Sequence, residues 1–268
     1  MTERRAVSLG DVALYYGLVL LLTVPLWLAG GATGIMLMPG LPLAGLAVVW
    51  PMIAALAVTL WRGGPGAAGQ LLARAADGGR VRPMAWWLAF ALIPLGVGLA
   101  CFLILRANGS GIPDLQASPG LVISLTATFI VAGIGEELGW TGFAFEPLRG
   151  RLGVAGAGLV IGLAWAAWHW PALLQADRAP AWIAWWTLGT VSQRLVMVWL
   201  YESAGRSLAA AVVFHAMSNL AWQLLPVRGS FFDPRLHGLL VAGLALALYA
   251  FRPAPGPRDH RRTPSPAG

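Results

Sequence analysis

The chain has 268 residues, of which 58% are hydrophobic and only 11% are charged. Soluble chains of this size carry about a quarter charged residues, so the composition excludes a water-soluble globule and predicts that lipid surrounds much of the protein. The formal net charge of +7 comes entirely from arginines that lie between apolar runs, a pattern that predicts membrane topology signals rather than a nucleic-acid groove. The single cysteine, Cys101, lies inside an apolar run and excludes a disulfide framework or a cysteine-based metal site.

Several apolar runs are about twenty residues long, which is the length a helix needs to cross a bilayer. In chain order they cover residues 11–30, 40–61, 84–106, 119–145, 153–174, 180–201, 207–226 and 235–251. The first run lacks a small-residue cleavage site, so we expect a retained helix rather than a signal peptide. The sequence therefore predicts an all-α polytopic membrane helix bundle with about eight transmembrane helices.

We expect one membrane-embedded domain over residues 1–251, without internal repeats of the transporter kind. Glycine, proline and charged residues between the spans predict turns, for example at residues 62–65. Residues 66–77 predict a connecting helix or a short helix on the inner membrane surface. Residues 252–268 are rich in proline and arginine and predict a disordered cytoplasmic tail that anionic lipid attracts.

The arginines also predict orientation, because cytoplasmic loops collect basic residues. With the N-terminus inside, thirteen of the 18 arginines are cytoplasmic and four are outside. Both termini are therefore expected in the cytoplasm. The remaining arginine, Arg194, falls within the predicted sixth span. The composition, without lysine and rich in Ala, Gly and Arg, favours a bacterial cell membrane.

Polar groups inside the spans are few, and each ionised side chain costs about 2.5–3.5 kcal/mol at a helix centre, so their positions indicate function. Glu136 and Glu137 lie in the fourth span, His169 in the fifth, and His215 with Asn219 in the seventh. Since His215 and Asn219 are four residues apart, they share one helix face. The two adjacent glutamates are about 100° apart around their helix and must do different jobs. Nearby glycines leave room for close approach of a neighbouring helix or of a substrate backbone.

Other histidines and the tryptophans have ordinary interpretations. His237 and His260 are expected in an outer turn and in the cytoplasmic tail, where they would be solvated. Most of the fourteen tryptophans fall near span ends, as interface anchors do, whereas Trp140, Trp165 and Trp168 are candidates for lining a cavity.

The polar motifs resemble those of the CPBP family, the CAAX-protease and bacteriocin-processing membrane endopeptidases also known as Abi proteins. The likeness covers about residues 130–225, within core helices over 119–226. The family pattern of Glu-Glu-x-x-x-Arg, Phe-x-x-x-His and His-x-x-x-Asn stands here as Glu136-Glu137-Leu138-Gly139-Trp140-Thr141, Trp165-Ala166-Ala167-Trp168-His169 and His215-Ala216-Met217-Ser218-Asn219.

Two positions depart from that pattern. Trp165 stands in place of Phe, and Thr141 in place of Arg, so the intrahelical ion pair with Glu137 is missing. Glu137 is then expected to be protonated, to hydrogen-bond the Thr141 hydroxyl, or to pair with Arg194.

The resemblance implies an intramembrane endopeptidase. Glu136 would be the base that activates a water, His169 would orient or coordinate that water, and His215 with Asn219 would stabilise the oxyanion. Glu137 would hold the site in shape. A divalent metal such as zinc on Glu136, His169 and His215 is one option, and a metal-independent glutamate mechanism is the other.

The expected partners are a membrane-associated protein or peptide substrate and the lipid bilayer, with no nucleic acid. Family precedents are prenylated CAAX proteins and bacteriocin-related peptides, between which the sequence does not select. Two alternatives from other classes stay open: a proton-coupled transporter that uses the glutamates and histidines as a relay, and a non-catalytic relative that binds a membrane protein.

Overall fold

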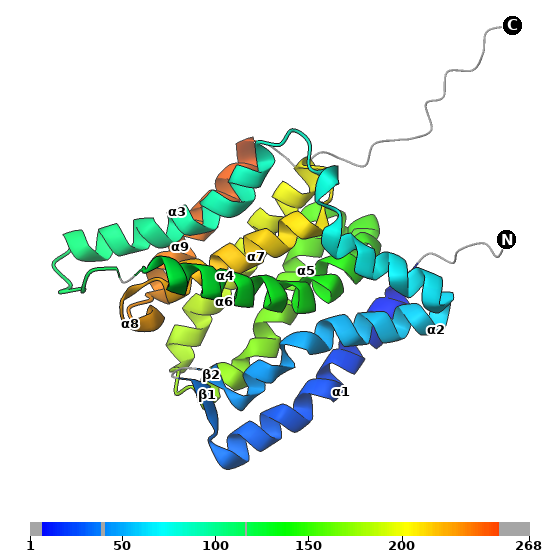
Figure 1. The fold of residues 1–268 in the computed structure, drawn as a ribbon, viewed down its shortest axis with the longest axis horizontal. Helices are drawn as coiled ribbons and strands as arrows, with labels where there is room; N and C mark the ends of the chain where they lie inside the picture. The colour runs from blue at the N-terminus through cyan, green and yellow to red at the C-terminus, as the bar shows by residue number, and fades with distance from the viewer. Residues whose placement is uncertain (1–6, 39–40, 116, 252–268) are drawn as a thin grey trace, which may run out of the picture.

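The computed structural model describes residues 7–38, 41–115 and 117–251. Almost all of this part of the chain is helical, and Figure 1 shows long helices packed into one bundle. The elements are α1 (Leu9–Thr33), β1 (Met36–Met38), β2 (Leu41–Pro42), η1 (Leu43–Val49), α2 (Trp50–Ala73), η2 (Arg74–Ala76), η3 (Gly78–Arg80), α3 (Trp86–Ala107), α4 (Pro119–Glu137), η4 (Leu138–Phe143), α5 (Phe145–Gln175), α6 (Pro180–Ser203), α7 (Leu208–Gln223), α8 (Pro226–Gly229) and α9 (Pro234–Phe251).

The predicted all-α polytopic bundle is confirmed, and a helix occupies each of the eight predicted spans. Among the described residues, six helical segments are long and apolar enough to cross a membrane. The other two predicted spans are α6, which contains the buried Arg194 and Glu202, and α7, which has 16 residues. The predicted tail over 252–268 lies outside the described residues.

Helix starts follow from local sequence. Ser118 and Ser207 precede α4 and α7, and each side-chain oxygen accepts a hydrogen bond from the backbone N–H three residues on. Pro119 then occupies the first position of α4, where a missing N–H costs nothing. Helix α2 doubles back at Gly64, whose φ of 71° suits glycine, so residues after this turn form the short connecting helix predicted over 66–77.

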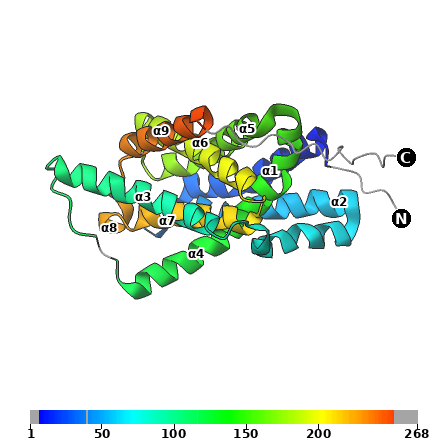
Figure 2. The same ribbon diagram turned by 90° about the horizontal axis from the view of Figure 1, so that it is seen from above.

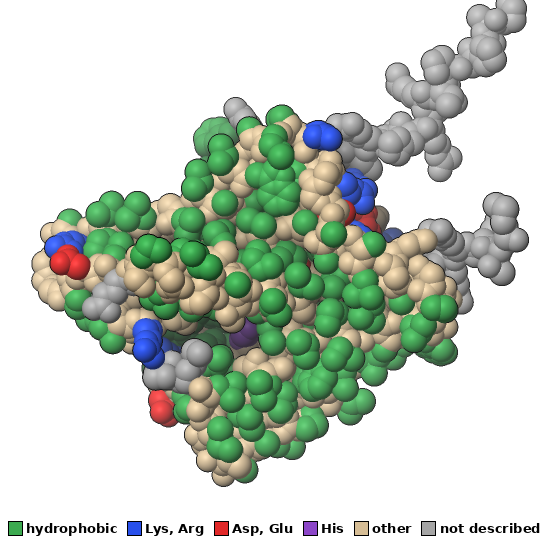
Figure 3. All heavy atoms as spheres, viewed as in Figure 1, with side chains coloured by type: hydrophobic (Ala, Val, Ile, Leu, Met, Phe, Trp, Pro, Cys, Tyr) green, Lys and Arg blue, Asp and Glu red, His purple; other side chains and the backbone are tan. Residues whose placement is uncertain are grey.

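Two rows of helices make up the bundle. Figure 2 shows α9, α6 and α5 along one side and α3, α7 and α4 along the other, with α1 and α2 at one end. The surface in Figure 3 is mostly hydrophobic, with charged side chains confined to a few places near its edges, as lipid requires. The integral membrane location is therefore supported by the surface as well as by helix length.

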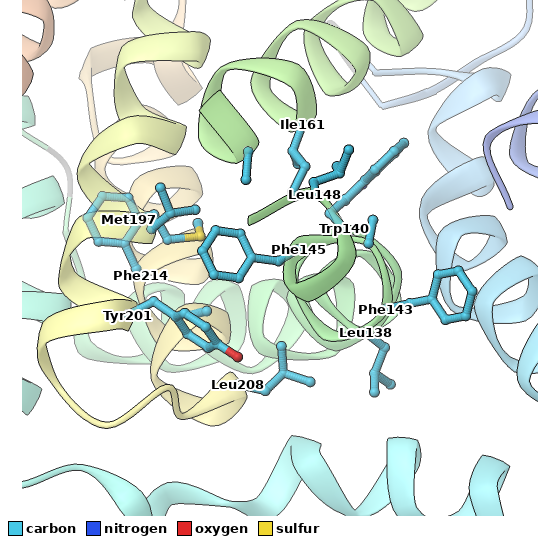
Figure 4. Close-up of a cluster of buried hydrophobic side chains, with 14 of the residues drawn as sticks. Leu138, Trp140, Phe143, Phe145, Leu148, Ile161, Met197, Tyr201, Leu208 and Phe214 are labelled. Carbon is cyan, nitrogen blue, oxygen red and sulfur yellow. The ribbon is translucent and has the colours of Figure 1, made fainter. Parts of the chain in front are cut away.

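Helix α4 does not end at Glu137 but continues as one wide π-helical turn, η4. Leu138, Trp140 and Phe143 project from this turn into the core, and Phe145 follows at the start of α5 (Figure 4). Trp140 is 1% exposed and packs against the rings of Tyr15 and Trp168. The segment that carries both glutamates is thus anchored on several sides by large buried side chains.

Candidate active site

Glycines let other elements approach the glutamate segment closely. A Cβ on Gly135 would lie 2.8 Å from the Val48 carbonyl oxygen, and one on Gly139 would lie 2.5 Å from the Pro51 carbonyl oxygen. The expectation that the glycines admit a neighbouring element is confirmed. η1 and the start of α2 therefore lie against this segment, in which Glu136 and Glu137 are 5% and 0% exposed.

Glu137 is held by an ion pair and by hydrogen bonds from three elements. Arg194 on α6 donates from Nη1 to Oε2 at 2.6 Å and from Nη2 to Oε1 at 2.9 Å. The Thr141 hydroxyl donates to Oε2 at 2.5 Å. Two of the three alternatives that the sequence left open, the threonine hydrogen bond and the Arg194 pair, are therefore present together.

The same carboxylate orients His215. Nδ1 of His215 lies 2.8 Å from Glu137 Oε1. Since an arginine-paired carboxylate only accepts, the hydrogen is assigned to Nδ1, which leaves Nε2 toward the interior. His215 is 2% exposed, and its Nε2 lies 3.9 Å from Glu136 Oε1. Glu136 on α4 and the Nε2 side of the His215 ring on α7 therefore face each other across a gap of this size.

Glu136 has its own partner on α5. The Trp165 indole donates to Glu136 Oε2 at 2.5 Å. The Trp165 ring also contacts the rings of His169 and His215, at centroid distances of 5.0 and 5.3 Å. From the sequence, Trp165 was expected only as a substitute for Phe and as a cavity-lining residue. The sequence nevertheless contained a sign of this role, because the indole of tryptophan has an N–H donor that the phenyl ring of phenylalanine lacks.

His169 lies beside this cluster rather than between the glutamates and His215. Its Nδ1 lies 2.9 Å from the carbonyl oxygen of Trp165, one turn earlier in α5. A carbonyl only accepts, so Nδ1 carries the hydrogen and Nε2 is the free nitrogen. Trp168 and Trp186 flank the ring at 4.7 and 5.6 Å. Trp168 itself donates to the Thr23 hydroxyl at 2.9 Å and so lies behind the site.

Asn219 lines a small cavity next to the cluster, one helical turn beyond His215. The cavity volume is about 40 Å³, enough for water. Its lining includes the polar side chains of Thr190, Gln193, Ser218, Asn219 and His237, together with Trp165. The sequence expectation for His237 was wrong: it lies in α9 rather than in a solvated turn, and it is half-buried against Gly189 and Phe232. His260 lies outside the described residues.

The proposed zinc ligands do not form a metal-binding group. Within the described ranges, no three His, Cys, Asp or Glu side chains are placed to hold a metal ion. The hydrogen bonds of His215, His169 and Glu136 leave both Nε2 atoms and Glu136 Oε1 outside them, but these donors are not gathered as a ligand set in this arrangement. The use of a metal stays a prediction, and no chemical step is derived through a metal.

Fold and site together define an integral membrane protein whose helix bundle encloses a cluster of two carboxylates, two histidines and one arginine, of which all but the half-buried His169 are buried. Residues 118–221 match the family model for Rce1-like, type II CAAX prenyl endopeptidase Rce1-like, proteins. CAAX prenyl protease 2 of Methanococcus maripaludis is 27% identical over 153 residues, which is 52% of this chain and 56% of that protein. The match thus spans about half of either chain. Both findings support the likeness of the motifs to the CAAX-protease, or CPBP, family.

Proposed function

We propose that this protein is an intramembrane endopeptidase that hydrolyses a peptide bond in a membrane-associated protein or peptide. The observation that carries the proposal is the facing pair of Glu136 Oε1 and His215 Nε2, 3.9 Å apart. That separation exceeds a direct hydrogen bond and fits one bridging water. Both groups are held from behind, Glu136 by Trp165 and His215 by Glu137, so the water would meet an already oriented base.

In the proposed reaction, Glu136 accepts a proton from the bridging water while the water oxygen attacks the peptide carbonyl carbon. Glu136 then returns the proton to the amide nitrogen as the C–N bond breaks, which yields a carboxylic acid and an amine. His169, with Nδ1 held by the Trp165 carbonyl, has Nε2 free to orient the water.

The negative oxygen of the tetrahedral intermediate needs hydrogen-bond donors. His215, in its doubly protonated form, and the Asn219 amide are proposed for this role because they lie one turn apart on α7. Asn219 also faces the cavity of about 40 Å³, a route by which water could reach the base.

The family description and the relative's name concern CAAX prenyl peptides, so a farnesylated CAAX peptide is the first defined substrate to test. Purified protein in lipid nanodiscs is incubated with this peptide, and the products are identified by mass spectrometry. New peptide termini in membranes of expressing cells are mapped in parallel, which also covers unprenylated substrates.

Wild type, Glu136→Gln and Glu146→Gln are compared at equal protein level. Glu146 is a matched control because its side chain is 43% exposed and pairs with Arg149 and Arg206, away from the site. We expect cleavage by wild type and Glu146→Gln, and a loss of at least about 100-fold in Glu136→Gln, the scale of general-base catalysis. Cleavage that survives in Glu136→Gln, or peptide maps identical in all three, overturns the proposal.

A further inference from the structure

Arg194 brings a charged side chain from α6 into the candidate site, where it is fully buried. The packing of α5 against α6 explains how it gets there. A Cβ on Gly162 would lie 3.2 Å from both Val191 Cα and Arg194 Cβ, and a Cβ on Gly158 would lie 2.7 Å from Val198. These two glycines are four residues apart, so they form one small-residue face that lets the helix backbones approach. The guanidinium is thereby carried into the space next to α4.

On one side, Arg194 fixes Glu137. Its two terminal nitrogens bind both carboxylate oxygens at 2.6 and 2.9 Å, and Nη1 also donates to the Thr141 hydroxyl at 3.1 Å. A fork of this kind fixes the plane of the carboxylate, which a point charge does not. Because Glu137 Oε1 also accepts from His215, the orientation of that ring depends on Arg194.

On the other side, Arg194 supports Trp165. The guanidinium carbon lies 5.1 Å from the centroid of the Trp165 ring, within the range of a cation–π contact. Trp165 is the donor to Glu136. Arg194 thus contacts both Glu137, the partner of His215, and Trp165, the partner of Glu136.

We infer that Arg194 is a positioning residue that sets the Glu136–His215 separation through its contacts with Glu137 and Trp165. It does not touch the proposed water and is not a catalytic residue. This inference rests on the proposed function for its catalytic readout, and on the geometry alone for its structural one.

The test uses Arg194→Lys and Arg194→Met in nanodiscs, with Arg149→Met as a matched control. Arg149 on α5 makes a comparable two-nitrogen pair with Glu202 on α6, at 3.0 and 3.2 Å, outside the site. Values of kcat and KM are measured on the substrate found above, and thermal unfolding is followed in the same samples.

Arg194→Lys keeps the charge but not the fork, so we expect kcat to fall about 10-fold with KM within about twofold. Arg194→Met should lower kcat about 100-fold. Arg149→Met should lower the unfolding temperature while kcat stays within about twofold of wild type. The inference is overturned if Arg194→Met keeps the wild-type kcat, or if Arg149→Met loses as much kcat as Arg194→Met does.

A second readout separates this inference from the proposed function. The Nδ1 proton of His215, assigned by its absence in His215→Ala, is followed by low-field ¹H NMR in detergent micelles. We expect its resonance to move in Arg194→Met and to stay in Arg149→Met. If the wild-type protein cleaves no substrate and the resonance still moves in Arg194→Met, the proposed function fails and the positioning role stands. If wild type cleaves and the resonance stays, the positioning role fails alone.

Discussion

Replacing Trp165 with phenylalanine tests whether the indole N–H holds the proposed base. The change deletes the 2.5 Å hydrogen bond to Glu136 and leaves a ring that can still contact His169 and His215. A hydrogen bond to a charged group is worth about 1.5–3 kcal/mol, and about 1.4 kcal/mol is a factor of ten in rate. If the whole bond serves to position the base, kcat falls roughly 10- to 150-fold.

The assay is initial-rate cleavage in nanodiscs, with kcat and KM determined separately. Trp170→Phe is the matched control, because Trp170 lies on the same helix, is 43% exposed, and donates to Thr187 at 3.0 Å away from the site. Its kcat should stay within about twofold of wild type. If Trp165→Phe cleaves as fast as wild type, the indole does not hold the base and its proposed role is refuted.

Three further outcomes follow from the geometry. Asn219→Ala should lower kcat about 100-fold if the amide stabilises the oxyanion, and unchanged kinetics would remove it from that role. Gly162→Ala places a Cβ 3.2 Å from Arg194 Cβ and should cost about 1–3 kcal/mol of stability, whereas Gly17→Ala, with no atom within 4 Å, should not; equal unfolding temperatures would argue against tight α5–α6 packing. Because the histidines and Glu136 are not placed as a ligand set, Glu136-dependent cleavage should persist after dialysis against a chelator, and loss that zinc restores would show that the donors rearrange.

The bundle itself could be predicted from the sequence because lipid imposes a simple rule. A spanning segment must bond its own backbone and present apolar side chains, and both requirements leave a signal in consecutive residues. The turn at Gly64 was similarly predictable, since glycine beside proline marks a change of direction. The orientation of the termini stays a prediction.

The site could be predicted only in part. The sequence indicated that three spans, which carry Glu136 and Glu137, His169, and His215 with Asn219, contribute polar groups to one interior, but distances between helices depend on packing that no local pattern encodes. The π turn after Glu137 left no recognisable period, and His237, which was expected in an outer turn, lies in α9. The roles of the individual side chains stay predictions until the variants are measured.

The two departures from the family motif have one physical interpretation in the folded chain. Thr141 carries no charge that could neutralise Glu137, and Arg194 supplies that charge from α6, with the threonine hydroxyl in contact with both. Trp165, in place of Phe, supplies a hydrogen bond to the other glutamate. Substitutions that look like losses along the sequence are thus compensated by hydrogen bonds between helices.

The wide turn at η4 also affects how this chain can be compared with others. Six residues, Leu138–Phe143, wind more loosely than an α-helix, so the stretch holds more chain than the same rise of regular helix would. Deleting one residue there would let the turn close as α-helix, keep Glu137 in place and leave the later side chains facing nearly the same directions, with their residue numbers lowered by one. A relative with regular winding would then present a different residue number to the same carboxylate. Alignments across this turn should follow the direction of side chains rather than a fixed count from the glutamates.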